Sequence, residues 1–392
     1  MVSDTTALLR VTLGKADISK QVIRVDIEDV DRGADKATFL MEDPGSTNSE
    51  RVERLMDVRI ELGWETEYTL LFVGQVSSVQ SVAAATGARS RLEVKCIDKS
   101  YLFMDRPTID KRQHVGKLKD ILTEMAKRVG ITLGDVLIDP MPEFTKDKPL
   151  NQLDRTDWQM LQDVAEEYRA RAFIEVNVAV TDSEEVKKAG GEPKLYFVSE
   201  DALLAQDPMG TLLYCRGMGR LLEFDYTRTS SGASPVASAA VANPDSGQPE
   251  AHAAVPAPPQ PEPPPKDNSE RVEKVLGSAA SADQAAGIQN VKDAPVKPAD
   301  KPPTKEVLGA PSDPPRAEQK VKPDRTRIMG FSGKGTAIGT VFLRAKGSVK
   351  IDGISSTAAG RWYVSRVNHI YERAEIDKKV SISFRSKLVA TR

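Results

Sequence analysis

Hydrophobic and polar residues alternate along the first hundred residues of the chain. The run "VIRVDIEDV" places Ile23, Val25 and Ile27 on one side of a strand, with polar residues between them. Similar runs follow one another from Leu8 to about Asp105, separated by Gly, Asp, Ser and Asn residues that favour turns. Short strands at such regular spacing predict a small antiparallel barrel or sandwich.

The hydrophobic period changes after His114. In "HVGKLKDILTEMAKRVGI" the apolar residues recur at the spacing of one helix face, and Gly130 stands where a helix end is expected. The apolar residues of this face are Leu118, Ile121, Leu122, Met125 and Val129.

A second predicted helix begins within "NQLDRTDWQMLQDVAEEYRARAFIEV", residues 151–176. Thr156 is followed three residues later by Gln159, which is the pattern of a capping box. Trp158 lies on the apolar face of this helix, and we interpret it mainly as a core residue, with subunit contact as the alternative.

An alternating run follows this helix. Ile174 and Val176 fall on one side of a strand, and Glu175 and Asn177 fall on the other. The run "KLYFV" is expected to pair back across a turn. These patterns predict a helix-plus-hairpin unit with a single apolar face that needs a partner.

The chain becomes β-like again from Ile328 to Arg392. Three alternating runs, "TVFLRAKGSVKIDGI", "GRWYVSRVNHIYE" and "KKVSISFRSK", are separated by turn residues. Together with residues 211–228 they are predicted to complete a second barrel.

A long insert separates these two pieces. Between Tyr226 and Phe331 there is no aromatic residue, and most of the 25 prolines of the chain fall in this window. Proline removes a backbone donor and interrupts helices, and a segment without aromatic residues buries too little surface to offset its ordering entropy. Residues 231–325 are therefore predicted to be an extended insert.

Two short apolar islands interrupt the insert, at residues 273–279 and 305–311, and both contain Val-Leu-Gly. Two interpretations remain open. The repeat is a chance feature of a low-complexity segment, or the islands are docking motifs that hold a neighbouring subunit.

The predicted fold is therefore α+β and mainly β, with two small antiparallel β-barrels, an intervening helix-plus-hairpin domain and a long Pro/Ala-rich insert. The predicted limits are 1–110 for the first barrel, 111–210 for the helix-hairpin domain, 211–230 plus 326–392 for the second barrel, and 231–325 for the insert.

Composition excludes several classes of protein. Among 392 residues, 55 Lys and Arg face 57 Asp and Glu, a net charge of -2 that argues against a general nucleic-acid binder. No apolar run is long enough to span a membrane, and the N-terminus lacks a secretory signal, so we expect synthesis in the cytoplasm. Cys96 and Cys215 lie in apolar runs and are interpreted as small core residues.

The sequence contains no strong catalytic or ligand-binding motif. The glycine-rich stretch at residues 330–339, "GFSGKGTAIG", lacks the ending of a phosphate-binding loop and is interpreted as a loop between strands. His114, His252 and His369 are far apart, and His369 is interpreted as a strand residue with a satisfied ring. We predict no catalytic, cofactor-binding or metal residues, no cofactor and no enzymatic activity.

Three pairs of carboxylates stand close together in the sequence, and glycoside hydrolysis uses one such pair. Each pair has a simpler interpretation as a solvated helix residue, a helix N-terminal charge or a loop residue. The pairs are Glu166 with Glu167, Asp154 with Asp157, and Asp139 with Glu143.

The stretch at 151–176 resembles an element of baseplate hub proteins of contractile machines: the phage late control protein D family, the hub portion of VgrG proteins, and the hubs of extracellular injection systems. In that family a Gln and a "sDwdfL" segment lead a helix "LAeryGa", followed by a hairpin. The matching residues here are Gln152, Asp157, Trp158, Leu161, Ala165 and Tyr168. Arg169 and Ala170 depart from the usual glycine.

Three further stretches resemble the same family. They are "LLFVGQV" in the first barrel, "VGKLKDILTEMAKRVGI" in the preceding helix, and the G-x-[YW]-x-V-x-x-V-x-H pattern at residues 360–369 in the last barrel. The matches touch most of the chain outside the insert.

The resemblance implies a structural role. Such hubs are homotrimers in which each subunit has two similar barrels, so that six barrels match a sixfold tail tube and the threefold side accepts a trimeric spike. The implied partners are the chain itself, a spike protein, an inner tube or tube-initiator protein and other baseplate proteins, within a phage tail or injection-system particle. No spike-like domain precedes Arg392, so a separate chain is expected to supply the spike.

Two other functions remain as alternatives. A peptidoglycan hydrolase would need a cleft with two carboxylates about 5–9 Å apart. A glycan-binding module of a tail would need exposed aromatic platforms, and the only tryptophans are Trp64, Trp158 and Trp362.

Overall fold

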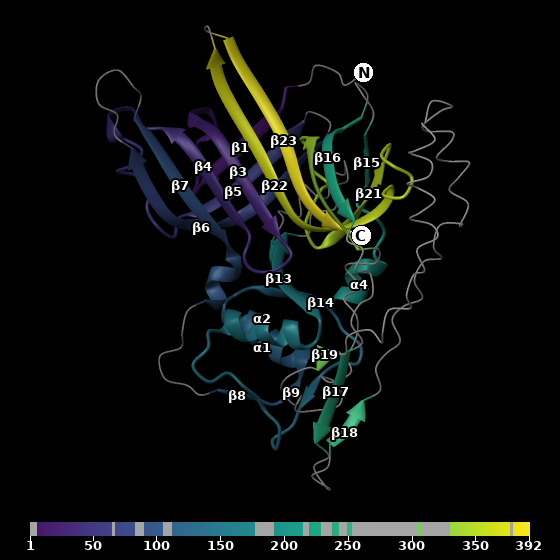
Figure 1. The fold of residues 1–392 in the computed structure, drawn as a ribbon. Coiled ribbons are helices and arrows are strands. Elements are labelled where there is room, and N and C mark those ends of the chain that lie inside the picture. Colours follow the sequence, from purple (N-terminus) through teal and green to yellow (C-terminus); the bar gives the residue numbers. More distant parts are fainter. Residues whose placement is uncertain are drawn as a thin grey trace, which may run out of the picture. The chain divides into compact units, whose positions relative to one another are not determined.

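The structure, a computed structural model, describes residues 6–64, 67–82, 90–104, 112–176, 192–214, 219–228, 237–242, 249–252, 305–306, 330–376 and 379–392. The chain divides into two compact units. The first combines Met1–Ser230 with Arg325–Arg392, and the second is Ser231–Asp324. Strands dominate the described residues, as the sequence predicts (Figure 1).

The N-terminal part of the first unit is an antiparallel sheet with the strand order β3-β4-β7-β6-β5-β1-β2. Its side chains alternate between a buried and a more exposed face, which confirms the prediction from the hydrophobic pattern. Its strands are β1 (Leu8–Leu13), β2 (Ala16–Asp17), β3 (Val22–Val30), β4 (Lys36–Glu42), β5 (Asp57–Trp64), β6 (Glu67–Val82) and β7 (Arg91–Asp98), with short 3-10 turns at η1 (Ser19–Gln21), η2 (Pro44–Ser46) and η3 (Lys99–Phe103).

One strand differs from the predicted alternation. In β3 the register against β4 shifts between Val22 and Arg24, so Val22 is buried and Ile23 is only partly buried. Val25 and Ile27 occupy the inner face as expected. The same face then continues to Asp29, which is 1% exposed and places a carboxylate inside the protein.

The C-terminal strands form a second group around another apolar core. Strands β16, β20, β23 and β22 pair antiparallel, β21 adds to β22, and β15 adds to β21 in parallel. The core of this group contains Trp362, Val349 and Leu388. The strands are β15 (Thr211–Leu213), β16 (Leu221–Arg228), β20 (Phe331–Ile338), β21 (Gly347–Asp352), β22 (Gly360–Ile376) and β23 (Lys379–Thr391).

The two groups are one continuous sheet of 13 strands (Figure 1). Seven residues of β22, Arg366 to Glu372, pair with β3. The long strands β22 and β23 therefore serve both cores. Trp362 near the start of β22 is in the C-terminal core, whereas Tyr371 further along it and Phe384 in β23 are in the N-terminal core.

Both predicted helices of the middle region are present. Helix α1 (Leu118–Arg128) buries the predicted apolar face, and Gly130 adopts a φ of 75° just after it. Helix α2 (Asp157–Glu167) begins with the predicted capping box: the Thr156 hydroxyl accepts from the Gln159 backbone, and the Gln159 side chain accepts from the Thr156 backbone.

Helix α2 packs on a three-stranded sheet with the order β10-β14-β13. Strands β13 and β14 form the predicted antiparallel hairpin, and β10 pairs with β14 in parallel. The remaining elements of this region are β8 (Gln113–His114), β9 (Gly116–Lys117), β10 (Thr132–Leu137), β11 (Glu143–Phe144), β12 (Leu150–Asn151), β13 (Ala170–Val176), β14 (Pro193–Ser199) and α4 (Glu200–Ala205).

The expectation that this unit has a single apolar face is wrong. Six of the seven residues of β13 are buried, on both sides of the strand. Ile174 faces the helix core, whereas Phe173 packs with Tyr196, Leu203 and Tyr363 on the opposite face. The second face is covered because α4 and the C-terminal strands lie against it. Of the predicted outer residues, Asn177 lies outside the described residues.

The glycine-rich stretch at 330–339 is not a loop, contrary to the prediction. Residues Phe331–Ile338 form β20, which pairs with both β16 and β23. Glycine is needed because the Phe224 ring lies against this strand: a Cβ at Gly333 would lie 2.5 Å from the ring atom Cζ. The glycines make room for packing, and no turn or ligand is required to explain them.

The second unit contains three short described strands, β17 (Ala237–Ala242), β18 (Pro249–His252) and β19 (Lys305–Glu306). Strand β17 pairs antiparallel with β18 and in parallel with β19. The island at 273–279 lies outside the described residues, as does the island at 305–311 apart from its first two. Both interpretations of the islands therefore remain open.

The buried apolar residues of the first unit gather into separate clusters. One belongs to the N-terminal strands, one to the helices and one to the C-terminal strands. A small fourth cluster around Phe173 lies between the last two groups. The predicted limits of the individual domains remain predictions.

Candidate functional site: a buried charged junction beside a cavity

Charged side chains are buried where these groups of elements meet. Lys346, in the connection between β20 and β21, is 3% exposed. Its Nζ donates to Asp29 Oδ1 at 2.5 Å and to the Val30 carbonyl at 2.9 Å, and it lies 3.3 Å from Asp35 Oδ2. Asp29 and Asp35 flank the turn between β3 and β4, so this contact ties the N-terminal strands to the C-terminal strands.

Local structure explains how these groups come together. Asp29 continues the inner face of β3, and its Oδ2 accepts from the Ala345 backbone at 3.0 Å. Lys346 has a φ of 65°, and its backbone donates to the Val364 carbonyl at 3.0 Å. This left-handed conformation is uncommon for a residue with a side chain and costs free energy. The surrounding contacts therefore hold Lys346 in place.

The charges of Asp29 and Lys346 stabilise each other. Burial by itself would raise the pKa of Asp29, but the charges of Lys346 and Arg344 outweigh it and hold the pKa below its ordinary value. Burial would likewise lower the pKa of Lys346, but Asp29, Asp35 and Glu175 raise it well above its ordinary value. Both groups are therefore charged at neutral pH.

Asp35 and Asp98 behave differently from Asp29. Burial raises the pKa of Asp35 well above its ordinary value against the pull of Lys346, and the nearby Asp29 and Asp98 carboxylates add to the rise. Burial also raises the pKa of Asp98 to about 6, despite hydrogen bonds from Ser100. The junction therefore has more carboxylates than cations, and protons bind there more readily than in water.

A second buried ion cluster connects the helix-hairpin region. Arg171 of β13 pairs with Glu200 of α4 at 2.8 Å and lies 3.5 Å from Asp31 in the β3–β4 turn. The Tyr363 hydroxyl of β22 also donates to Asp31, at 3.5 Å. Burial opposes the charge of Arg171, but Glu200 and other neighbours raise its pKa. The β3–β4 turn thus contacts both other groups of elements through charged side chains.

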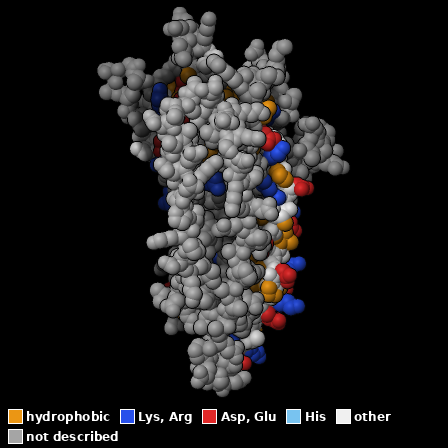
Figure 2. Space-filling model, turned by 45° about the vertical axis from the view of Figure 1, so that its right-hand side comes forward, with side chains coloured by type: hydrophobic (Ala, Val, Ile, Leu, Met, Phe, Trp, Pro, Cys, Tyr) orange, Lys and Arg blue, Asp and Glu red, His pale blue; other side chains and the backbone are white. Residues whose placement is uncertain are grey.

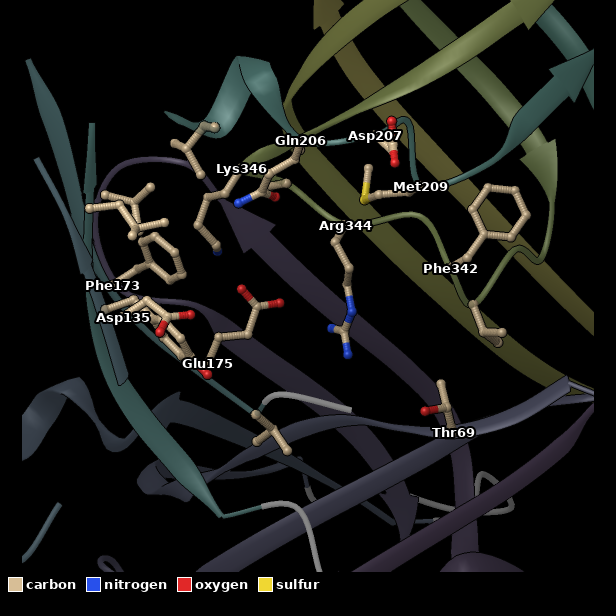
Figure 3. Close-up of a pocket in the computed structure, with 18 residues that line it drawn as sticks. Thr69, Asp135, Phe173, Glu175, Gln206, Asp207, Met209, Phe342, Arg344 and Lys346 are labelled. Carbon is tan, nitrogen blue, oxygen red and sulfur yellow. The ribbon is translucent and has the colours of Figure 1, made fainter. Parts of the chain in front are cut away.

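A cavity of about 510 Å³ lies beside this junction. The face of the three-stranded sheet opposite α2 forms one wall with Phe173, Glu175 and Tyr196, and the segment from Val341 to Gly347 forms the other. Figure 3 shows Glu175 of β13 directed toward the same space as Lys346 and Arg344, which both come from the connection between β20 and β21. This volume lies within the range of small-ligand sites.

The motif at 151–176 has a structural role in this molecule. Gln152 is fully buried, and its Nε2 donates to Asp157 Oδ1 at 2.6 Å and to the Arg155 carbonyl at 3.1 Å. Its Oε1 lies 3.2 Å from the ring of His114. Asp157 Oδ2 accepts from Arg128 of α1 at 2.7 Å. The Gln and Asp of the motif therefore join the two helices and the β8–β12 ladder.

Other residues singled out in the sequence also lie in structural positions. Trp158 is 7% exposed in the helix core, as predicted. His369 is fully buried with a satisfied ring, also as predicted: Nε2 donates to the Leu343 carbonyl at 3.0 Å, and Nδ1 accepts from Ser386 at 2.9 Å. Burial lowers the pKa of His369 to about 4, so the ring is neutral.

The predicted cysteine and carboxylate positions do not converge on one place. Cys96 is a buried free cysteine whose pKa is raised by burial, and Cys215 lies outside the described residues. Asp139, Glu143, Asp154 and Glu166 are exposed.

Within the described part of the chain, no group of three or more His, Cys, Asp or Glu is arranged to hold a metal ion. No described helix is long and apolar enough to cross a membrane.

The exposed surface contains apolar residues at the end of the large sheet. Strand β16 pairs only with β20, and β15 only with β21, among the described strands. Four side chains on or next to these edge strands are 37–48% exposed: Leu213, Tyr214, Leu222 and Tyr226. In Figure 2 the coloured side chains form a strip in which hydrophobic, acidic and basic groups are mixed.

Sequence reasoning missed the charged junction. One signal was present but not used: Asp29 follows Val25 and Ile27 on the same side of an alternating strand, which places a carboxylate on the side that faces the core. Lys346 and Arg171 carried no such signal, because their burial depends on contacts with residues more than a hundred positions away.

Sequence comparison identifies no relative: no family model matches the chain, and no curated protein matches it. Its fold, however, is similar to solved tail proteins. A tail protein from Neisseria meningitidis MC58 gives a TM-score of 0.59 at 11% identity, over 99% of this chain and 97% of that one. The 43 kDa tail protein of prophage MuSo2 from Shewanella oneidensis gives 0.61 at 10% identity, over 99% and 98%.

A third similar structure is an E. coli component of the type VI secretion system, described as similar to bacteriophage T4 tail proteins. It gives a TM-score of 0.53 at 9% identity, over 98% of this chain and 76% of that one. The chain therefore has the fold of phage tail and type VI secretion proteins. The resemblance to baseplate hub proteins is confirmed at the level of the fold.

Proposed function

We propose that the chain is a structural baseplate hub of a contractile phage tail or injection system, related to the late control protein D and VgrG hubs. Three copies assemble into a ring of six barrels. One side of the ring accepts the sixfold tail tube or its initiator, and the other accepts a trimeric spike. Other baseplate proteins surround it. The chain is made in the bacterial cytoplasm and assembled into the particle.

The observation that carries this proposal is the similarity of fold over nearly the whole length of two tail proteins, 97% and 98% of their chains. The continuous sheet supports it as well. Because β22 and β23 contribute to both the N-terminal and the C-terminal core, the two groups of strands are joined by shared strands. A ring that connects a tube to a spike would need its barrels joined in this way.

The open edges of the sheet support self-association. Leu222 and Tyr226 on β16 expose apolar surface next to a strand edge that no other described strand pairs with, and such an edge is a site for pairing with another chain. A closed homotrimer would cover the same edge in each copy.

The oligomeric state tests the proposal. We expect native mass spectrometry of the full chain, alone or mixed with a tube protein and a spike protein from the same particle, to give three copies per complex. The double variant Leu222→Glu/Tyr226→Glu is expected to remain monomeric, whereas Leu55→Glu, at a residue 63% exposed in the turn before β5, leaves the trimer intact. A chain that stays monomeric even with both partners present would contradict the proposal.

The proposed role is non-catalytic. Trp158 and Trp362 are buried and do not form glycan-binding platforms. We expect the purified chain to give no clearing zone in zymography on bacterial cell walls. A clearing zone that persists through purification would favour the hydrolase instead.

A further inference from the structure

The N-terminal and C-terminal strand groups repeat one arrangement. Five strands, each antiparallel to the next, follow the order β3-β4-β7-β6-β5 in the first group and the order β16-β20-β23-β22-β21 in the second. By its place in this order, β16 is the counterpart of β3, and β22 is the counterpart of β6.

Irregularities of register fall at matching places in the two groups. The pairing of β3 with β4 skips Ile23, and the pairing of β16 with β20 skips Leu222. The pairing of β6 with β7 skips Ser77, and the pairing of β22 with β23 skips Ser365. Both serines donate their hydroxyls to a carbonyl of the paired strand, at 2.9 Å and 3.2 Å. Each skipped residue is a β-bulge, and the matching bulges fix which residues correspond.

The edge of β3 is paired, whereas the corresponding edge of β16 is open. Strand β3 pairs with residues 366–372 of β22 on the side away from β4 (Figure 1). Ile27, four residues after the bulge of β3, is 1% exposed beside this strand. Tyr226, four residues after the bulge of β16, is 37% exposed, and no described strand pairs with β16 on this side.

Strand β6 has an open edge as well. Its counterpart β22 pairs with β3 directly after its own bulge. The same part of β6, residues 78–82, pairs with β7 alone among the described strands, since the pairing with β5 ends at Gln75. In the sheet β20, β23, β22, β3, β4 and β7 lie between β6 and β16, so these two edges do not pair with each other within one chain.

We propose that β16 of one copy pairs antiparallel with residues 78–82 of β6 in the next copy, in the register of the β3–β22 pair. This inference rests on the proposed hub function and adds which strands meet. Tyr226 then lies opposite Ser81 of the neighbouring copy, and Thr227 lies opposite Gln80. In a ring of three chains, junctions within a chain and junctions between chains would alternate around the six barrels.

The side chains suit this pairing. Tyr226 and Ser81 place a large ring opposite a small side chain on the inner face, and both are exposed in the single chain. Thr227 and Gln80 are polar and exposed, and they fall on the outer face. The contact therefore covers the aromatic surface of β16, and its backbone pairing gives partners to two open strand edges.

A second copy of the chain is favoured as the occupant because the chain itself carries both halves of the contact. The contact is head-to-tail, and a head-to-tail contact that closes produces a ring. Pairing of β16 with β16 of another copy would instead be isologous. It would close as a dimer and leave the edge of β6 open.

Disulfide trapping between two full-length chains tests the register. Gln80→Cys and Thr227→Cys are introduced separately, in a Cys215→Ser background, into two chains with different tags that are expressed together. Directly opposite residues of an antiparallel pair have Cα atoms about 4.5–5.5 Å apart, which a disulfide can bridge. We expect mild oxidation to give a covalent dimer that carries both tags on a non-reducing gel.

Ser78→Cys combined with Thr227→Cys is the matched control. Ser78 is exposed on the same face as Gln80, two residues along the strand. Its diagonal separation from Thr227 would be about 7–8 Å, too far for an unstrained disulfide. We expect at least about tenfold less covalent dimer than with Gln80→Cys. Equal trapping of both pairs, no trapping of either pair, or dimers formed by Thr227→Cys alone would overturn the proposed contact.

Hydrogen exchange provides a second measurement without cysteines. Amides of residues 78–82 should exchange more slowly in the wild-type chain than in Leu222→Glu/Tyr226→Glu, although these substitutions lie in the other barrel. Unchanged exchange in β6 would contradict the contact.

Failure of this contact and failure of the hub function are distinguishable. A chain that is trimeric by native mass spectrometry but gives no Gln80–Thr227 disulfide keeps the hub function and overturns the contact. A chain that stays monomeric with tube and spike proteins present overturns both.

Discussion

Single charged residues decide how the parts of this chain are joined. Lys346 is buried with its ammonium group against Asp29, and both are 2% exposed at the side chain. A buried ion pair adds little net stability compared with apolar packing, but removal of one partner leaves an uncompensated charge. The junction therefore specifies one arrangement of the surrounding strands.

This leads to a prediction for Lys346→Met. We expect a loss of about 3–5 kcal/mol in the free energy of unfolding, measured by urea denaturation, because Asp29 remains buried without its cation. Lys350→Met is a matched control, since Lys350 pairs with Asp352 at 2.8 Å while its side chain is 52% exposed. The control should cost less than about 1 kcal/mol. Equal effects of the two variants would contradict the role of burial.

His369 makes a second prediction at the residue scale. Its folded pKa of about 4 is below the 6.5 expected in the unfolded chain, so the unfolded state binds more protons between these values. The neutral His369 ring therefore contributes fully to the free energy of unfolding above pH 6.5. This contribution falls by about 3 kcal/mol as the pH falls toward 4.

The measurement compares wild type with His369→Gln, by chemical denaturation from pH 7 to pH 4. The difference in unfolding free energy between the two proteins should shrink as the pH falls. Asp98 has the opposite effect, because its folded pKa of about 6 exceeds the 3.8 of the unfolded state, but it is common to both proteins and cancels. A constant difference across this range would show that His369 is not buried in its neutral form.

At the scale of elements, the start of α2 combines local and tertiary signals. The capping box fixes where the helix begins, and Gln152 and Asp157 connect it to α1 and to the β8–β12 ladder. The helix thus has a defined start as well as a defined orientation. This explains why the chain has a recognisable motif at the start of α2 although it has no catalytic motif.

We predict that Thr156→Ala lowers the free energy of unfolding by about 1 kcal/mol, because an amide at the helix N-terminus loses its acceptor. The matched control is Thr123→Ala within α1, where the exposed hydroxyl bonds to the Lys119 carbonyl of the same helix. There alanine should be neutral or slightly stabilising, since it favours helix more than threonine does. Thermal denaturation measures both, and a loss at Thr123 as large as at Thr156 would argue against capping.

At the scale of the whole molecule, the sheet joins two cores that the sequence presents as separate barrels. Pairing of β22 with β3 and the contribution of Phe384 to the N-terminal core make each core depend on the other. Tryptophan fluorescence can report the unfolding of each core separately, because the three tryptophans of the chain lie in or against three different cores. Trp64 packs against the N-terminal core, Trp158 lies in the helix core and Trp362 in the C-terminal core.

Single-tryptophan variants, with the other two replaced by phenylalanine, should therefore show a shared transition. We expect Trp64 and Trp362 fluorescence to report the same midpoint in urea. Phe384→Leu should lower both midpoints together, although Phe384 belongs to the N-terminal core only. Two separate midpoints, or a shift confined to Trp64, would mean that the barrels unfold independently.

Sequence patterns determined most of the local structure. Alternation located the strands of both barrels, and the capping box located α2, because these signals depend on neighbours within a few residues. The fold class followed from the same patterns. The predictions failed where packing prevailed over local chemistry: glycines in β20 serve the Phe224 ring, and β13 is buried on both faces.

Tertiary structure alone decided the charged junction and the cavity. Lys346, Arg171 and Glu175 are hydrophilic residues in unremarkable sequence contexts, and their burial arises from strands that meet only after the chain has folded. A sequence determines which face of a strand is apolar, since that depends on the period of the chain. It does not reveal which charges will share a low-dielectric space, because that depends on distances between residues hundreds of positions apart.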